Sequence, residues 1–308
     1  MKIFDLFKRK NKAKFKKVFV IVNPIAGGPK LVRYEKLLKN FFSKYKISYS
    51  YKVTSKPAEA IQLAKNAAKE KYELVIAAGG DGTINEVVNG IINSKSILGI
   101  IPLGTINILA MELGIPQNFT KALNLILTGS VKAIDIGKVN DRYFVLMAGF
   151  GMDSYAIYRT NLKLKKYIGA LAYVISGIYS IFKYPPHKIS VNIDNHRIDD
   201  TGYFVVVENV PSYGGKFKIA PYADVNDGLL DVCVFKKTGI FHTFRYFLGI
   251  ALKKHIHYPD VRYYQCKKVE LASNHNVLVH TDGDVIGSLP AQITVLRKKL
   301  KVLVPEND

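Results

Sequence analysis

The sequence predicts an α/β fold with two domains, an N-terminal domain built on a parallel β-sheet and a C-terminal antiparallel β-sandwich. Up to about residue 133, apolar strand-like runs alternate with segments of helical periodicity, which is typical of a parallel sheet covered by helices on both faces. From about residue 134, short β-type runs follow one another between turns rich in Gly, Asn and Asp, which is typical of a sandwich. A chain of 308 residues is long enough for two hydrophobic cores.

In the first domain, each expected strand is an apolar or alternating run, and each expected helix repeats its apolar residues three and four positions apart. The expected strands cover residues 18–22, 47–54, 74–78 and 97–101, and the expected helices cover residues 31–44, 58–69 and 84–92. Turns at residues 23–28, 79–83 and 102–107 follow three of these strands. Because ligands of parallel sheets bind outside the carboxyl ends of the strands, we expect the three turns to converge on one ligand site.

In the second domain, the expected strands lie at residues 143–148, 189–193, 203–208, 230–235, 268–271 and 277–280, with helical segments at 162–182 and 239–254. Residues 293–304 alternate in polarity again, and we expect them to return to the first domain. The predicted organisation is a basic tail at 1–15, an α/β domain at 16–133, a β-sandwich domain at 134–292 and a returning strand at 293–308. His255 and His257 are expected on the surface of a strand.

The chain has a formal net charge of +21, with 37 lysines and eight arginines. Lysine is a strongly hydrated point charge, so an excess dominated by lysine favours diffuse attraction to an anionic surface. No helix-turn-helix, RRM or basic stripe with interleaved aromatic residues accompanies this charge, so we expect no nucleic-acid partner.

Membrane attachment is expected to be peripheral. The longest nearly uncharged apolar run, residues 168–182, is shorter than the about 20 residues that span a bilayer. The tail combines a short apolar patch at residues 3–7 with a basic cluster, which supports reversible contact with a membrane at most. Cys233 and Cys266 are too few for a disulfide framework and fit a reducing cytosol.

The most informative run begins with Gly79-Gly80-Asp81-Gly82-Thr83-Ile84-Asn85, which follows an apolar strand and leads into a helix. A glycine-rich turn from strand to helix gathers backbone N–H groups at the positive end of a helix dipole, which suits a phosphate. The Asp81 carboxylate would repel that phosphate unless a cation lay between them. The run therefore indicates a nucleotide with a metal, although a tight turn without a ligand is the alternative for a GGDG sequence alone.

The full run, residues 79–90, resembles the GGDGTxNEVxNG signature of the diacylglycerol kinase catalytic-domain family, which includes bacterial lipid kinases and the sphingosine and ceramide kinases. The likeness covers residues 16–305. It implies an ATP-binding domain of the NAD kinase/diacylglycerol kinase type, a lipid-substrate β-sandwich domain, and ATP and Mg²⁺ as cofactors. A shorter GGDGT also occurs in NAD kinases, so this motif alone leaves the substrate open.

Two further turns resemble nucleotide-site elements of the family. Residues 23–28 resemble the NPxxGG turn, and residues 102–107 resemble the PLGTxN element. The family often continues with Asp-Phe-Ala-Arg, whereas this chain has Ile-Leu-Ala-Met at residues 108–111. By position, the resemblance implies that ATP is bound by Asn23, Thr54, Gly79, Gly80, Asp81, Gly82, Thr83, Ile84, Asn85, Gly104 and Thr105.

In the second domain, residues 224–232 resemble the DDGxLDV element, which binds a structural Mg²⁺ in family members. The resemblance implies that Asp227 and the carbonyls of Asp224 and Leu229 are its ligands, an all-oxygen set that suits a hard cation. A hairpin turn is the alternative use of an Asp-Gly pair. Residues 281–284 resemble the catalytic DGE, which supplies the general base: Asp282 matches it, and Asp284 replaces its glutamate with a side chain one methylene shorter.

These expectations predict an ATP-dependent lipid kinase that phosphorylates a lipid hydroxyl, with diacylglycerol as the first candidate acceptor. Asp81 would hold the Mg²⁺ at the phosphates, and Asp282 or Asp284 would accept the hydroxyl proton. A kinase for NAD or another soluble substrate, and a catalytically weak regulator that binds nucleotide or lipid, are the alternatives. We expect a cytoplasmic protein held at the inner face of an anionic membrane, and an exposed sheet edge can support a homodimer.

Overall fold

The computed structural model describes residues 14–159, 185–195, 198–215 and 217–306. The chain divides into two compact units, which we call unit 1 (Met1–Ile134 with Lys299–Asp308) and unit 2 (Asp135–Lys298). Nearly all of the basic tail, and the helix expected at residues 162–182, lie outside the described residues.

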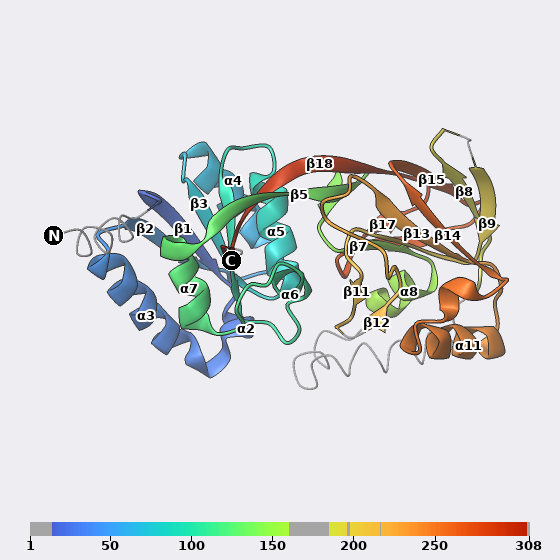
Figure 1. The fold of residues 1–308 in the computed structure, drawn as a ribbon, viewed down its shortest axis with the longest axis horizontal. Helices are drawn as coiled ribbons and strands as arrows, with labels where there is room; N and C mark the ends of the chain where they lie inside the picture. Colours follow the sequence, from blue (N-terminus) through green and yellow to red (C-terminus); the bar gives the residue numbers. More distant parts are fainter. Residues whose placement is uncertain (1–13, 160–184, 196–197, 216, 307–308) are drawn as a thin grey trace. The chain divides into compact units, whose positions relative to one another are not determined.

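Unit 1 is built on a parallel sheet (Figure 1). Its strands lie in the order β2 (Ser48–Val53), β1 (Lys17–Val22), β3 (Leu74–Gly79) and β4 (Ile97–Pro102). The end of β18 (Ala291–Val304) adds a parallel partner beside β4, where Val302 pairs with Leu98. All six residues of β3 are buried, as expected for a parallel strand covered on both faces.

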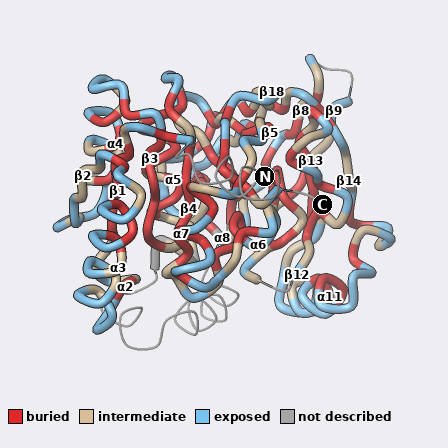
Figure 2. Tube along the Cα trace, turned by 60° about the vertical axis from the view of Figure 1, so that its left-hand side comes forward, coloured by how far each residue is buried: buried red, intermediate tan, exposed pale blue. Residues whose placement is uncertain are grey.

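The helices of unit 1 that flank the sheet are α3 (Leu31–Lys44), α4 (Glu59–Lys69), α5 (Asp81–Ile91) and α7 (Phe119–Thr128). The chain leaves β1 for the edge strand β2 and then returns across β1 to β3, so right-handed crossovers place α3 and α4 on opposite faces. Tyr34 of α3 stacks on Phe119 of α7, with ring centroids 4.3 Å apart. Figure 2 shows buried residues concentrated on the strands and on the inner sides of these helices.

The turns that follow the strands of unit 1 contain helical structure that the sequence pattern did not predict. The turn after β1 forms α2 (Pro24–Gly27) and a 3₁₀ turn (Gly28–Lys30), and α6 (Ile108–Glu112) follows the turn after β4. Helix α5 begins at Asp81, three residues before the first apolar residue of its periodic pattern. Within the glycine-rich run, Gly79 therefore ends β3, Gly80 is the N-cap of α5, and the residues from Asp81 form the first turn of the helix.

Unit 2 is an antiparallel β-sandwich, as predicted. One sheet has the order β14 (Val261–Cys266), β13 (Leu230–Phe235), β10 (Phe204–Glu208), β7 (Met147–Phe150), β16 (Leu278–Thr281) and β17 (Asp284–Ser288). The facing strands are β18, β15 (Lys268–Ala272), β8 (Ile189–Ile193) and β9 (Ile198–Gly202), together with β5 (Ser130–Val139) and β6 (Arg142–Phe144). Buried apolar side chains from both sets, including Phe144, Phe150 and Ile293, form the core.

The remaining elements in the described part of unit 2 are α8 (Met152–Arg159), β11 (Ser212–Tyr213), β12 (Phe217–Lys218), α11 (Ile240–Ala251) and a 3₁₀ turn (His255–His257). The prediction of a surface position for His255 was wrong. His255 is buried, and its Nε2 lies 2.8 Å from the carbonyl oxygen of Ile219, because the 3₁₀ turn directs the ring inward. Within the described ranges, no helix has the length and apolar composition needed to cross a bilayer.

Candidate functional site

Three turns at the carboxyl edge of the unit 1 sheet carry the predicted nucleotide residues. Asn23 follows β1, Gly80 follows β3 and Gly104 lies two residues after β4. The chain leaves β1 toward β2 on one side and places β3 on the other, so the strand order reverses between β1 and β3. Open α/β sheets bind ligands at such a reversal.

The turns after β1 and β3 are hydrogen-bonded to each other. The Asn23 side chain donates from Nδ2 to Thr83 Oγ1 over 3.1 Å, and the Asn23 backbone N–H donates to the Ala78 carbonyl over 2.9 Å. The Asn23 Oδ1 also accepts from the Ile25 N–H at 3.0 Å, which caps α2. Asn23 and Thr83 therefore fix the two loops as one surface.

The turns after β3 and β4 meet at two glycines. A Cβ on Gly104 would lie 2.6 Å from the Gly80 Cα, closer than real Cβ atoms approach other atoms. Gly80 is the N-cap of α5 and has no side chain that could cap its first N–H groups. These N–H groups, at the positive end of the helix dipole, suit an anion.

Asp81 stands in the first turn of α5, whereas the sequence pattern predicted a turn that precedes the helix. Its Oδ1 accepts the N–H of Leu109 over 3.3 Å, which connects α5 to the start of α6. Burial raises the pKa of the Asp81 carboxyl, although the N–H groups of Ile108, Leu109 and Asn107 oppose that shift. A nearby cation would favour the ionised form, so the environment of Asp81 fits a metal-bound nucleotide.

The other predicted ATP contacts of unit 1 differ in their exposure and in the hydrogen bonds that they already make. Thr54 lies beside the end of β1, where its N–H donates to the Val22 carbonyl over 2.9 Å. Thr105 is exposed between β4 and α6. Ile84 is fully buried and its N–H already donates to the Gly80 carbonyl at 3.1 Å, whereas Asn85 is buried and accepts from Asn89.

Two residues that organise this edge were absent from the predicted ATP contacts. Asn107 adopts a left-handed conformation (φ 60°), accepts the Gly104 N–H over 2.9 Å and donates to the Gly104 carbonyl over 2.9 Å. Glu86 accepts the N–H groups of Ala58 and Ala60, each over 3.1 Å, at the start of α4. For Asn107, the sequence offered one signal, because asparagine adopts the left-handed conformation more readily than most residues do.

The predicted metal loop of unit 2 gathers carboxylates. Desolvation, followed by the charges of Asp224 and Asp135, raises the pKa of Asp227. The Asp227 Oδ1 accepts the Leu229 N–H over 2.9 Å, so the loop folds around this side chain. In the part of the chain that the structure describes, no group of three His, Cys, Asp or Glu side chains could hold a metal by itself, so carbonyl oxygens would have to complete a site here.

Asp135 of β5, which contacts this loop, was missed by the sequence analysis. It is fully buried, and its carboxylate accepts the N–H of Gly228 over 2.7 Å and the N–H of Lys298 over 2.5 Å.

Nearby, Asp231 is buried, and its Oδ2 has no hydrogen-bond donor among the described residues. Burial raises the pKa of Asp231 to about 6, opposed by Tyr263 and Gln265 and reinforced by Asp227. A hard cation with bound water would relieve this crowding of oxygens, so the donor set fits Mg²⁺.

The predicted catalytic element forms the turn between β16 and β17. Asp282 and Gly283 both have positive φ, of 48° and 89°, which a tight two-residue hairpin requires. The Asp282 carboxylate accepts three backbone N–H groups at 2.8–2.9 Å, those of Val145, Leu146 and Met147. Asp284 is exposed at the first position of β17. Asp282 thus anchors the β6–β7 connection, and the two carboxylates of this element differ sharply in environment.

The structure therefore brings the predicted ATP contacts together on one edge of unit 1. The predicted metal and proton-accepting residues, Asp224, Asp227, Leu229, Asp282 and Asp284, all belong to unit 2.

Comparison with known proteins identifies the family. Residues 17–139 match the diacylglycerol kinase catalytic domain, and residues 147–304 match the YegS C-terminal NAD kinase beta sandwich-like domain. A diacylglycerol kinase of Bacillus subtilis (strain 168) is 31% identical over 294 residues, which cover 94% of this chain and 97% of that protein. The chain belongs to the diacylglycerol kinase family. The resemblance inferred from its motifs is confirmed, and with it the prediction of a lipid kinase enzyme.

Other members of the diacylglycerol kinase family agree with this assignment. The diacylglycerol kinase of Staphylococcus carnosus (strain TM300) is 31% identical over 95% of this chain and 96% of its own length. Two crystal structures from Bacillus anthracis str. Sterne, both described as diacylglycerol kinases, match with TM-scores of 0.81 and 0.77. They are 29% and 28% identical, each covers 95% of this chain, and 96% and 98% of their own chains are matched. The predicted fold class is confirmed.

Proposed function

We propose that the protein transfers the γ-phosphoryl group of ATP to the hydroxyl of diacylglycerol, which yields phosphatidic acid. The observation that carries this proposal is the first turn of α5, held at the carboxyl edge of the sheet by the contact between Asn23 and Thr83. The choice of diacylglycerol as the acceptor rests on the relatives that are named diacylglycerol kinase.

The unit 1 residues bind and orient the phosphates in this proposal. The N–H groups of residues 80–83 donate to phosphate oxygens, and the absence of a Cβ on Gly80 and Gly104 keeps the two loops in contact. Asp81 would hold Mg²⁺ at this position, and the ion would neutralise part of the charge that the transferred phosphoryl group carries. Thr54, Thr105 and the buried Asn85 define the rest of the edge.

We assign proton acceptance to Asp284 and a positioning role to Asp282. The carboxylate of Asp282 is already bonded to three N–H groups, whereas Asp284 is exposed at the end of the same turn. An aspartate reaches about one methylene less far than the glutamate of the family pattern. A displacement of about 1 Å can cost roughly 100-fold in rate, so the replacement of Asp284 by glutamate is a direct test of reach.

A structural Mg²⁺ in the loop of residues 224–229 is part of the proposal. Asp227 and the carbonyl oxygens of Asp224 and Leu229 would hold it, supported by Asp135 and Asp231. Mg²⁺ should raise the melting temperature of the wild-type protein, since a ligand that binds only the folded state stabilises it. The increase in melting temperature should be smaller in Asp227→Ala. An equal increase in both proteins would show that Mg²⁺ does not bind in this loop.

The proposed substrate places the protein in the cytoplasm, at the inner face of the membrane that contains diacylglycerol. A homodimer remains a prediction, supported by the position of β2 at the edge of its sheet.

The acceptor is tested by incubating the protein with γ-labelled ATP and Mg²⁺, in parallel with mixed micelles of diacylglycerol and with NAD. Label in phosphatidic acid is expected. Label in NADP alone would favour the soluble-substrate alternative, and tight ATP binding without labelled product would favour the regulator.

A further inference from the structure

Helix α11 presents large apolar side chains to solvent. Phe241, Phe244 and Phe247 are 73%, 68% and 58% exposed, and Ile240, Leu248 and Leu252 are between 47% and 56% exposed. At 3.6 residues per turn these positions form one continuous stripe, roughly 140° wide, along the outer side of the helix. We call this stripe, Ile240, Phe241, Phe244, Phe247, Leu248 and Leu252, the outer face of α11.

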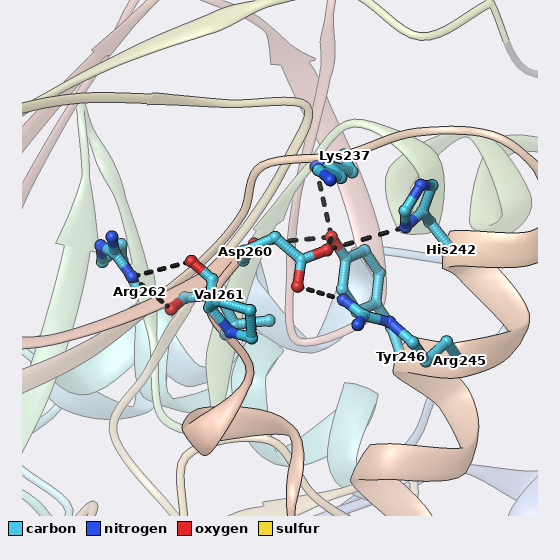
Figure 3. Close-up of polar contacts among 8 residues, drawn as sticks. Lys237, His242, Arg245, Tyr246, Asp260, Val261 and Arg262 are labelled. Atoms are coloured by element: carbon cyan, nitrogen blue, oxygen red, sulfur yellow. Dashed lines mark hydrogen bonds and ion pairs between the residues drawn. The ribbon is translucent and has the colours of Figure 1, made fainter.

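The opposite side of α11 is firmly attached to unit 2. Tyr246, Gly249 and Ile250 are buried, and a Cβ on Gly249 would lie 2.7 Å from the Tyr258 ring. Figure 3 shows the Asp260 carboxylate directed toward both Arg245 and Tyr246. Tyr246 donates its hydroxyl to Asp260 Oδ2 over 2.6 Å, and Arg245 pairs with Oδ1. Because the helix is already packed on one side, its outer face is not needed for the core of unit 2.

The surroundings of the outer face are cationic. Residues 236–259 contain no Asp or Glu but include five basic residues, Lys236, Lys237, Arg245, Lys253 and Lys254. Lys236 is paired with Asp200 over 2.6 Å, so the positive charge beside the helix comes from Lys237, Lys253 and Lys254. Lys253 and Lys254 are exposed directly after the helix, and Lys237 is exposed shortly before it. The nearest acidic residue in the sequence, Asp260, is already paired with Arg245.

We propose that the outer face of α11 docks on the surface of an anionic lipid bilayer, a partner that deepens and rests on the lipid substrate proposed above. Aromatic and aliphatic side chains on one face of a helix, flanked by lysines, are the composition of helices that lie in a membrane interface. Anionic headgroups attract each nearby lysine, whereas a second copy of the chain would bring like charges together. Phe217, whose ring centroid lies 5.5 Å from that of Phe247, extends the apolar surface beside the helix.

The test is co-sedimentation of the full-length protein with vesicles, without ATP. Vesicles of phosphatidylcholine with an equal part of phosphatidylglycerol are compared with phosphatidylcholine alone. The double variant Phe244→Ser/Phe247→Ser should lose roughly tenfold in partitioning to the anionic vesicles, because two large apolar anchors are gone. The matched control, Val32→Ser on α3 at a residue 78% exposed, should bind as the wild type does.

A charge variant separates the two contributions. Lys253→Glu/Lys254→Glu should weaken binding to the anionic vesicles and leave the weak binding to pure phosphatidylcholine unchanged, and added salt should reduce the difference. Wild-type binding by the phenylalanine variant, at an unchanged melting temperature, overturns the proposal. A loss of dimerisation in that variant with vesicle binding intact also overturns it, because the face would then join two copies.

The outcome is separable from that of the proposed activity. Vesicle binding requires no phosphoryl transfer, so binding through α11 without phosphatidic acid production contradicts only the proposed reaction. Conversely, the phenylalanine variant should phosphorylate a short-chain diacylglycerol dispersed in detergent at the wild-type rate. If its rate on this dispersed substrate were as low as its rate on vesicles, the substitutions would have damaged the enzyme itself and not its docking.

Discussion

Asn23 donates a hydrogen bond from Nδ2 to Thr83 Oγ1 over 3.1 Å, and this contact joins the turn after β1 to the first turn of α5. The two residues are 60 positions apart in the sequence. Because Thr83 is buried, neither water nor another side chain easily replaces this acceptor. The contact makes the geometry of the proposed phosphate site depend on both turns together.

Thr83→Val should weaken ATP binding and destabilise the fold by about 1–3 kcal/mol, since the Asn23 amide loses its acceptor at a buried position. Thr83→Ser keeps the hydroxyl and should retain most of the ATP affinity. Calorimetric titration with ATP compares the two. Equal affinity of the valine variant and the wild type would show that the contact does not shape the site.

Gly104→Ala and Gly82→Ala should separate stability from nucleotide binding. A Cβ on Gly104 meets Gly80 at 2.6 Å, so this variant should lose about 1–3 kcal/mol of stability. A Cβ on Gly82 meets no protein atom within 4 Å, so that variant should fold normally but bind ATP more weakly if phosphate lies against this turn. Thermal melting and ATP titration of both variants provide the readouts. Full ATP affinity of Gly82→Ala would place the phosphates elsewhere.

Asp282→Asn should behave as a folding defect, whereas Asp284→Asn should behave as a catalytic one. The amide at position 282 loses charge-assisted hydrogen bonds to three N–H groups, which should cost about 2–3 kcal/mol. Asp284→Asn should cost less stability than Asp282→Asn, while kcat falls by roughly 10²–10⁴ with little change in KM. Asp284→Glu keeps a carboxylate on a longer side chain and should retain more activity than Asp284→Asn. An active Asp284→Asn enzyme would exclude this residue as the base.

Asp260→Asn should lower stability at neutral pH and have little effect in acid. Burial raises the pKa of Asp260, but hydrogen bonds from Tyr246 and Arg245 outweigh it and hold the folded pKa below the ordinary value of 3.8. The ionised form therefore stabilises the fold above about pH 3.8, and this contribution is lost as the pH falls through the folded-state pKa. Chemical denaturation of both proteins from pH 7 to pH 3 should show the stability difference shrinking. A difference that grew toward acid would contradict the assignment.

The parallel sheet, the sandwich and the positions of the three loops followed from the sequence because their signals are local. Apolar runs such as that of β3, and the glycines of the loop that follows it, can be recognised within a few residues of sequence. The start of α5 at Asp81 was harder to predict from the sequence, since the glycines of its first turn interrupt the apolar periodicity.

Contacts between distant segments had no such signal. Asp135 meets Gly228 and Lys298, 93 and 163 residues away, and nothing in its own neighbourhood marks it as the centre of a loop. The burial of His255 depends likewise on the carbonyl of Ile219. The outer face of α11 was hidden because a helix that is apolar on both sides has the same composition as a core helix.

The most direct test of the account is the initial rate of label transfer from γ-labelled ATP to diacylglycerol by the wild-type protein and by Asp81→Asn. This variant keeps an oxygen that can accept the Leu109 N–H but removes the charge proposed to hold Mg²⁺. We expect labelled phosphatidic acid from the wild type and none above background from the variant, at similar melting temperatures. A variant as active as the wild type, or a wild type that labels no lipid, would contradict it.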